Sequence, residues 1–192
     1  MRTHTTTAAL AAGLLLTVTG CGADHVRPTS GPAATAASDT PSPSGSPTAM
    51  GPLPFGAAMK VTDTEDGTAG TVTVLGYEQR GITAQTSADE EFGTSGYVWA
   101  TIELKVCSTR GTLGATRYPW ALAYADGSRI EPSGVTYGDF PKPEYPYEAK
   151  IKAGDCVRGK TVFAVPGAQR PERVLYTTDL FDTPPEWTVP LA

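Results

Sequence analysis

Short segments with alternating apolar and polar residues dominate the chain from about residue 56 onward. In the clearest of them, Tyr97–Val106, every second residue from Val98 is apolar, while Trp99, Thr101, Glu103 and Lys105 fall on the other face. The same kind of pattern predicts strands at residues 71–77, 120–124 with a return at 129–130, 147–152, 157–165, 172–178 and 186–189. No segment has the spacing of a convincing amphipathic helix. The pattern therefore predicts an all-β domain of two antiparallel sheets packed face to face.

Turn residues support this prediction. The chain contains 21 glycines and 17 prolines, which favour turns and linkers over long helices. Asp126-Gly127 predicts a two-residue hairpin turn, and Pro166-Gly167 ends the strand before it.

The N-terminus has the pattern of an export signal. Arg2 precedes an apolar run at residues 8–16, which is far shorter than the roughly 20 residues that span a bilayer. The following residues, Thr17-Val18-Thr19-Gly20-Cys21, resemble a bacterial lipobox, with Val18 where leucine is preferred. We expect residues 1–20 to be a lipoprotein signal peptide and the Cys21 thiol to carry a diacylglycerol. The protein would then be lipid-anchored at the extracytoplasmic face of the cell membrane, unless this is an ordinary signal peptide with a chance cysteine.

A low-complexity segment follows the lipobox. Of the 31 residues from Gly22 to Pro52, 25 are Ala, Pro, Gly, Ser or Thr. Such a composition buries too little apolar surface to offset the entropy cost of ordering, so we expect a disordered tether over residues 21–55. The folded domain is expected to span residues 56–192.

Composition excludes several function classes. The two histidines, His4 and His25, both precede the expected domain, which removes Ser–His–Asp and Cys–His catalysis and His-ligated zinc. The net charge is −5 and no basic stripe is visible, which argues against a nucleic-acid partner. We expect no cofactor and no metal site, since neither acidic turn, at residues 63–67 or 89–91, has EF-hand spacing.

An enzyme that uses carboxylates stays open as the alternative. Paired acids need no fixed sequence spacing, and the candidate pairs are Glu65/Asp66, Glu90/Glu91 and Glu144/Glu148. They would serve a carboxylate-dependent, or oxygen-ligated-metal-dependent, cell-envelope hydrolase. Solvated acids on turns are the simpler interpretation.

Four segments together resemble a known family. Residues 97–106, 125–128, 152–159 and 162–166 are similar to the telokin-like, immunoglobulin-like domain of secreted bacterial lipoproteins. The resemblance covers residues 72 to 189 and implies an immunoglobulin-like antiparallel β-sandwich, of about seven strands by the segments above. It also implies a non-enzymatic binding or interaction module, because the shared motifs encode a sandwich rather than an activity. Cys107 stands where the family often has asparagine, which points to a disulfide-bearing branch.

Cysteine parity predicts one disulfide. Lipidation of Cys21 leaves Cys107 and Cys156, and such a pair usually bridges in an exported protein. Cys107 falls on the face of Trp99 and Lys105 and not on the apolar face. We therefore expect a bridge near strand ends and not the inter-sheet disulfide of antibody domains. Two free buried thiols are the alternative.

An aromatic loop gives the one hint of a binding surface. Residues 137–147 contain three prolines and four aromatic residues, Tyr137, Phe140, Tyr145 and Tyr147. Tyrosine-rich loops at the end of a sandwich often contact partners, here a cell-envelope protein, peptide or glycan. The alternative is that these rings plug the end of the hydrophobic core.

Overall fold

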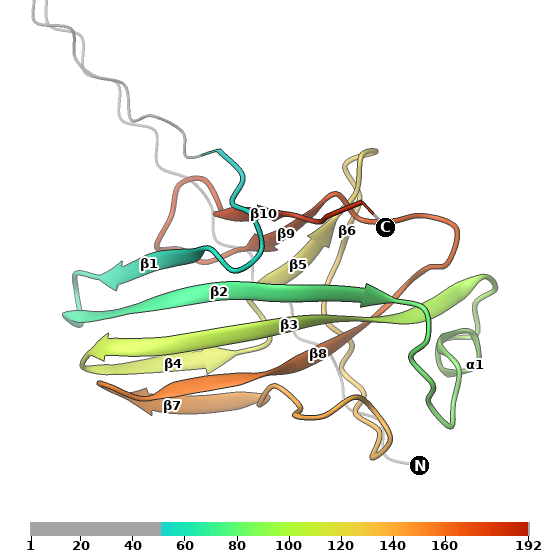
Figure 1. Ribbon diagram of the computed structural model, residues 1–192, viewed down its shortest axis with the longest axis horizontal. Coiled ribbons are helices and arrows are strands. Elements are labelled where there is room, and N and C mark those ends of the chain that lie inside the picture. Colours follow the sequence, from blue (N-terminus) through green and yellow to red (C-terminus); the bar gives the residue numbers. More distant parts are fainter. Residues whose placement is uncertain (1–50, 192) are drawn as a thin grey trace, which may run out of the picture. The chain divides into compact units, whose positions relative to one another are not determined.

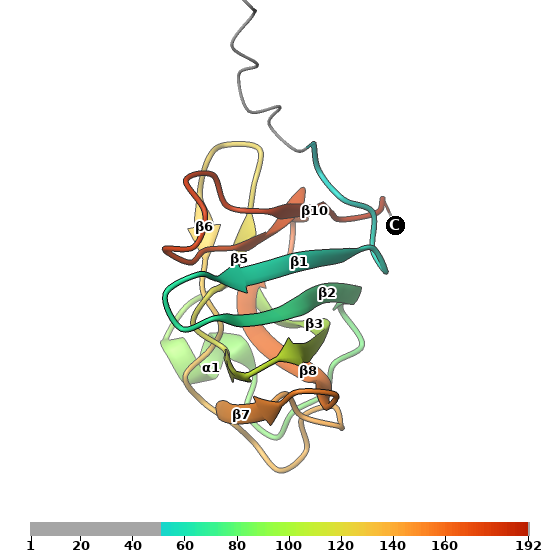
Figure 2. The same cartoon turned by 90° about the vertical axis from the view of Figure 1, so that its left-hand side faces the viewer.

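Two antiparallel four-stranded sheets form the domain (Figures 1 and 2), in a computed structural model that describes residues 51–191. The first sheet has the order β1-β2-β3-β8, the second has the order β10-β9-β5-β6, and a third ladder pairs β4 with β7. The strands of the first sheet are β1 (Ala58–Asp63), β2 (Thr68–Gln79), β3 (Tyr97–Arg110) and β8 (Cys156–Pro166). Those of the second are β5 (Trp120–Ala123), β6 (Arg129–Ile130), β9 (Arg173–Tyr176) and β10 (Glu186–Thr188). The remaining pair is β4 (Thr112–Thr116) and β7 (Glu148–Lys152).

The predicted all-β, immunoglobulin-like antiparallel sandwich is confirmed, with ten strands in the described residues where about seven were expected. The sequence analysis did not predict β1 and β4, each of which has a single buried apolar side chain, Val61 and Ala115. The Asp126-Gly127 turn is also wider than expected, since Tyr124 to Ser128 separate β5 from β6. In that turn the Asp126 carboxylate accepts hydrogen bonds from the Ser128 N–H and hydroxyl.

Folded structure begins before residue 56. The Leu53 N–H donates to the Glu186 carbonyl at 2.8 Å, and the Thr188 N–H donates to the Leu53 carbonyl at 2.9 Å. These two bonds form a parallel bridge to β10. The expected tether of residues 21–55 therefore extends too far, while the expected signal peptide and Cys21 lie outside the described residues.

The main core lies between the two sheets. The structure confirms which residues of β3 were predicted to face inward. Ala100, Ile102, Leu104 and Val106 are buried there. The second sheet contributes Trp120 and Trp187, which are fully buried with ring centroids 5.9 Å apart.

A second, smaller core covers one end of the outward face of β3 and β8. Trp99 points outward, as its parity predicts, but it is only 3% exposed because loop residues pack over it. The segment before β3 contributes Ala88, the first residue of the short helix α1 (Ala88–Phe92). In the same segment the Thr86 carbonyl accepts a hydrogen bond from the Trp99 Nε1–H at 2.9 Å. The loop after β6 contributes Phe140. The outward face is thus polar along most of β3 and apolar at the end where β3 begins.

Cys107 and Cys156 form the predicted disulfide. They lie directly opposite each other on the neighbouring strands β3 and β8, with their Cα atoms 4.0 Å apart. Both strands belong to the first sheet, so the bridge does not join the two sheets. It closes a segment of 49 positions that contains β4, β5, β6 and β7.

Candidate binding site

The structure divides the four predicted contact rings between core and surface. Phe140 is 2% exposed, and its ring centroid lies 5.0 Å from that of Trp99 in the second core. Tyr145 is fully buried in the main core. Neither ring can reach a partner, so the expectation that all four form a contact edge is corrected: these two plug the core.

Tyr137 and Tyr147 are more accessible. Tyr137 is half-buried, since its ring packs 5.1 Å from Phe140 and its hydroxyl donates to the Glu91 carboxylate. Tyr147 is 49% exposed. Of the predicted set, Tyr147 alone presents a large part of its ring to solvent.

Sequence reasoning missed two further exposed rings. Phe92 is 47% exposed and Tyr118 is 69% exposed, and with Tyr147 they are the exposed aromatic side chains of residues 51–191. Phe92 ends the short helix α1 (Ala88–Phe92), and Tyr118 lies in the turn between β4 and β5. We call these three residues the aromatic face. The exposure of Tyr118 could have been predicted from its place in the turn sequence Arg117-Tyr118-Pro119, because a turn buries few side chains.

The aromatic face borders two adjoining pockets. One, of about 100 Å³, is lined by Tyr118, Tyr147 and Arg117, and we call it the Arg117 pocket. The other, of about 360 Å³, is lined by Phe92, Thr94, Tyr97, Ile130 and Ala164, and we call it the Phe92 pocket. Residues 131–134 line both pockets. The two pockets therefore share residues 131–134, with Tyr118 and Tyr147 at one pocket and Phe92 at the other.

Strand pairing brings Tyr118 and Tyr147 together. Thr116, at the end of β4, is the register partner of Glu148, at the start of β7. The two tyrosines lie just past this pair, with ring centroids 5.7 Å apart and planes at 86°. The Tyr118 hydroxyl donates to the Tyr147 hydroxyl at 3.0 Å, and losing this bond on ionisation raises the pKa of Tyr118. Each ring thus holds the other in place.

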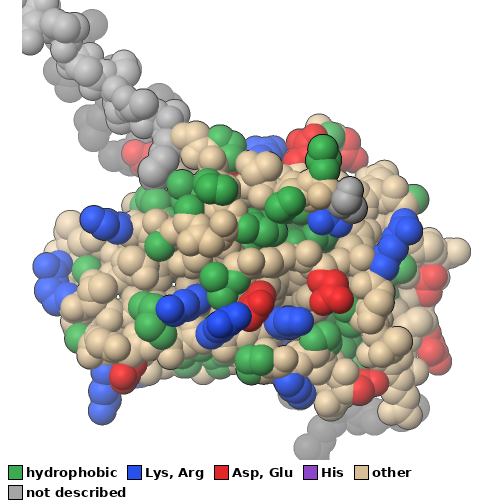
Figure 3. Space-filling view, in the orientation of Figure 1, with side chains coloured by type: hydrophobic (Ala, Val, Ile, Leu, Met, Phe, Trp, Pro, Cys, Tyr) green, Lys and Arg blue, Asp and Glu red, His purple; other side chains and the backbone are tan. Residues whose placement is uncertain are grey.

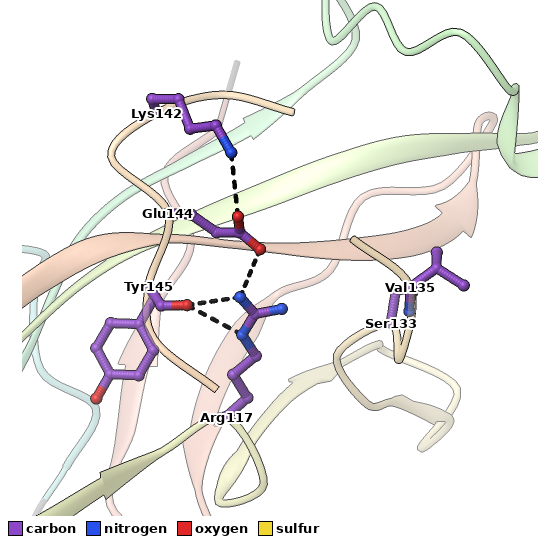
Figure 4. A network of polar contacts seen from close by, with 6 residues as sticks. All are labelled: Arg117, Ser133, Val135, Lys142, Glu144 and Tyr145. Atoms are coloured by element: carbon purple, nitrogen blue, oxygen red, sulfur yellow. Dashed lines mark hydrogen bonds and ion pairs between the residues drawn. The ribbon is translucent and has the colours of Figure 1, made fainter. Parts of the chain in front are cut away.

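Arg117 lines its pocket, and its side chain is only 8% exposed. Its Nε and Nη2 donate to the Tyr145 carbonyl at 3.0 and 2.6 Å, and Nη2 also donates to Glu144 Oε1 at 2.6 Å (Figure 4). The guanidinium carbon lies 5.5 Å from the centroid of the Tyr147 ring. The Arg117 guanidinium is therefore held rigidly by three hydrogen bonds.

Glu144 compensates the charge of Arg117. Lys142 Nζ lies 3.1 Å from the second carboxylate oxygen of Glu144. Burial by itself would raise the pKa of Glu144, but the hydrogen bonds and positive charges of Arg117 and Lys142 outweigh it and lower this pKa. Glu144 is therefore ionised at neutral pH.

Hydrogen bonds also fix the rest of the site. The Ser133 N–H donates to the Val162 carbonyl at 2.8 Å. Ser133 Oγ accepts from the N–H of Val135, which lies next to it in Figure 4, at 3.3 Å. Near Phe92, the Asp89 carboxylate accepts from the N–H groups of Tyr97 and Gly96 at 2.7 and 2.9 Å, which lowers the pKa of Asp89. These bonds attach both pocket walls to the first sheet.

The candidate carboxylate pairs lie apart from the two pockets or are engaged in other contacts. Glu65 and Asp66 lie in the turn after β1, where their N–H groups donate to Asp63. Glu90 and Glu91 lie on α1, and Glu144 is ion-paired as described. Within residues 51–191, no group of three or more His, Cys, Asp or Glu side chains is placed to hold a metal ion. No helix of this range is long and apolar enough to cross a membrane.

Charges of both signs are interspersed over the outward face of the first sheet (Figure 3). Arg158 Nε lies 2.8 Å from Glu103 Oε1, and Lys160 Nζ lies 3.7 Å from Glu78 Oε2. Basic side chains on this face are therefore partly neutralised by neighbouring acids.

Comparisons with known proteins reveal similarity of fold. No protein-family model matches the chain, and no curated protein does either. The crystal structure of MPT63, a secreted protein from Mycobacterium tuberculosis, aligns with 73% of this chain and 99% of that one, at 17% identity and a TM-score of 0.55. The structure of the yjhA protein from Bacillus subtilis aligns with 72% of this chain and 99% of that one, at 11% identity and a TM-score of 0.49. The chain thus shares the β-sandwich fold of a secreted bacterial protein.

Proposed function

We propose that this protein is a non-enzymatic binding module, anchored through Cys21 at the extracytoplasmic face of the cell membrane. Its ligand-binding surface is the aromatic face, and its partner is a component of the cell envelope. The telokin-like lipoprotein resemblance and the similarity to a secreted protein are consistent with this assignment.

One observation carries the binding assignment: the three exposed aromatic side chains of the described domain border two adjoining pockets. Aromatic rings bury a large area at small cost in side-chain entropy, so they supply much of the free energy of many interfaces. Exposed rings gathered around concave sites are typical of binding surfaces. The hydrogen bonds that fix both pocket walls reduce the entropy cost of binding further.

The first prediction tests the aromatic face. Full-length protein is mixed with washed, insoluble cell-envelope material, and the bound fraction is measured after sedimentation. We expect Tyr118→Ser and Tyr147→Ser each to weaken binding about tenfold, the effect of losing about 1.4 kcal/mol of contact free energy.

Leu180→Ser is the matched control, since Leu180 is 41% exposed and lines neither pocket. All three variants should keep the wild-type melting temperature, because the altered side chains are exposed. Equal binding by the wild type and both tyrosine variants would overturn the assignment.

The second prediction concerns the anchor. Two acyl chains give stable membrane attachment, since each buried methylene contributes about 0.8 kcal/mol. We expect Cys21→Ala to leave unprocessed precursor or to release protein into the medium. Cell fractionation and mass spectrometry of the N-terminal peptide would check this, and a Cys21→Ala protein that is processed and retained as before would contradict the anchor.

A further inference from the structure

The Arg117 pocket has the composition of a site for an uncharged, hydroxyl-rich ligand. Arg117 uses Nε and Nη2 for its contacts with Tyr145 and Glu144, and Nη1 points toward the segment that holds Ser133 (Figure 4). Because the Arg117 pocket is lined by both residues, Nη1 offers a hydrogen-bond donor to a molecule inside it. Glu131, which is exposed and lines the same pocket, offers an acceptor.

Charges around the Arg117 pocket compensate one another. Arg117 and Lys142 are positive, while Glu144 and Glu131 are negative. An anionic ligand would meet Glu131, and the whole chain is acidic with a net charge of −5. A cationic ligand would meet Arg117. A neutral ligand is repelled neither by Glu131 nor by Arg117. It can accept a hydrogen bond from Arg117 and donate one to Glu131.

The two tyrosines provide an apolar surface beside these polar groups. Tyr118 and Tyr147 are held perpendicular to each other and are both well exposed, so each retains free ring surface. A sugar ring has one face of C–H groups, which packs on an aromatic ring, and a rim of hydroxyls that both donate and accept hydrogen bonds. An aromatic platform next to a fixed guanidinium and a carboxylate fits both parts of a sugar.

Pocket size favours an oligosaccharide over one sugar. The Arg117 pocket, of about 100 Å³, lies below the usual range of ligand sites, which begins at about 300 Å³. The adjoining Phe92 pocket adds about 360 Å³ across the shared residues 131–134 and has another exposed ring. A chain of sugars could lie over both.

We propose that the aromatic face binds a neutral glycan, with the C–H face of one sugar stacked on Tyr118, beside the Tyr147 ring, and its hydroxyls bound by Arg117 and Glu131. This inference rests on the proposed function and specifies its ligand class. A peptide ligand is the competing outcome.

The test uses full-length protein on an array of neutral oligosaccharides, together with peptides of the cell envelope, followed by titration with the best ligand. We expect binding to a neutral oligosaccharide that changes less than about twofold between low and high salt, because no ion pair forms. Tyr118→Ser and Glu131→Ala should each weaken it about tenfold. Glu172→Ala, an exposed acid outside both pockets, is the control and should leave it unchanged.

Each other outcome has a distinct meaning. Peptide binding without oligosaccharide binding, still lost in Tyr118→Ser, would overturn the glycan assignment and leave the proposed function intact. Glycan binding that survives both Tyr118→Ser and Glu131→Ala would overturn the site. An absence of any binding to array and envelope material alike would overturn both proposals.

Discussion

At the residue scale, burial separates aromatic side chains that look equivalent in the sequence. Phe140 and Tyr147 lie seven positions apart in the same proline-rich loop, yet one is 2% exposed and the other 49%. Phe140 packs edge-on against Trp99, whereas Tyr147 packs against Tyr118 at the surface. Their substitution should therefore affect different properties.

The third prediction follows from this contrast. Phe140→Ala should lower the free energy of unfolding by about 3 kcal/mol, because it leaves a cavity beside Trp99. Tyr147→Ala should change it by less than about 1 kcal/mol, because the side chain is exposed. Urea unfolding of both variants measures the difference, and similar stabilities would contradict the assignment of Phe140 to a core.

At the element scale, one close backbone contact places the candidate site. Residues 143–145 lie along β8, where the Tyr145 N–H donates to the Lys160 carbonyl and the Lys160 N–H donates to the Pro143 carbonyl, each at 2.8 Å. Gly159 permits this approach, since a Cβ there would lie 2.5 Å from the Tyr145 nitrogen. The same segment carries Glu144 and the Tyr145 carbonyl, which hold Arg117.

The fourth prediction concerns this contact. Gly159→Ala should displace residues 143–145 from β8 and destabilise the domain by about 1–3 kcal/mol, as overpacking does. It should also weaken ligand binding, because Arg117 loses its fixed position. Gly114→Ala is the matched control on β4, since a Cβ there meets no atom within 4 Å. Thermal unfolding and the sedimentation assay give the two readouts, and equal effects of the two substitutions would refute the argument.

At the scale of the whole molecule, the disulfide encloses most of the candidate site. Arg117, Tyr118, Glu131 and Tyr147 all lie between Cys107 and Cys156, while Phe92 comes from outside this segment. Closing a loop of 49 positions restricts the unfolded chain, which corresponds to a stabilisation of about 4 kcal/mol.

The fifth prediction is that replacing both Cys107 and Cys156 by Ala lowers the free energy of unfolding by up to about 4 kcal/mol. Non-reducing mass spectrometry of the wild type should show a cross-linked peptide containing both cysteines. Two thiols that react freely with an alkylating agent in the native, unreduced protein would contradict the bridge.

The local sequence pattern was enough to predict the β-sandwich, the inward-facing and outward-facing side chains of β3, and the pairing of the cysteines. Alternation with period two is a property of neighbouring residues, and the cysteines of the expected domain, Cys107 and Cys156, can be counted as a pair. These features needed no knowledge of which strands become neighbours. The short strands β1 and β4 were not predicted from the local pattern.

Only the tertiary structure decided which aromatic rings are exposed and which residues share a pocket. Tyr118 and Tyr147 meet through the pairing of β4 with β7. Glu131, from a third segment, lines the pocket of the two tyrosines and also that of Phe92, from a fourth. Whether a side chain is buried or exposed depends on what packs over it. Trp99 lies on the mostly polar outward face of β3 and is nevertheless buried, because loop residues cover it. Burial depends on contacts between segments far apart in the chain. Such contacts produce no periodic pattern in the sequence of any one segment.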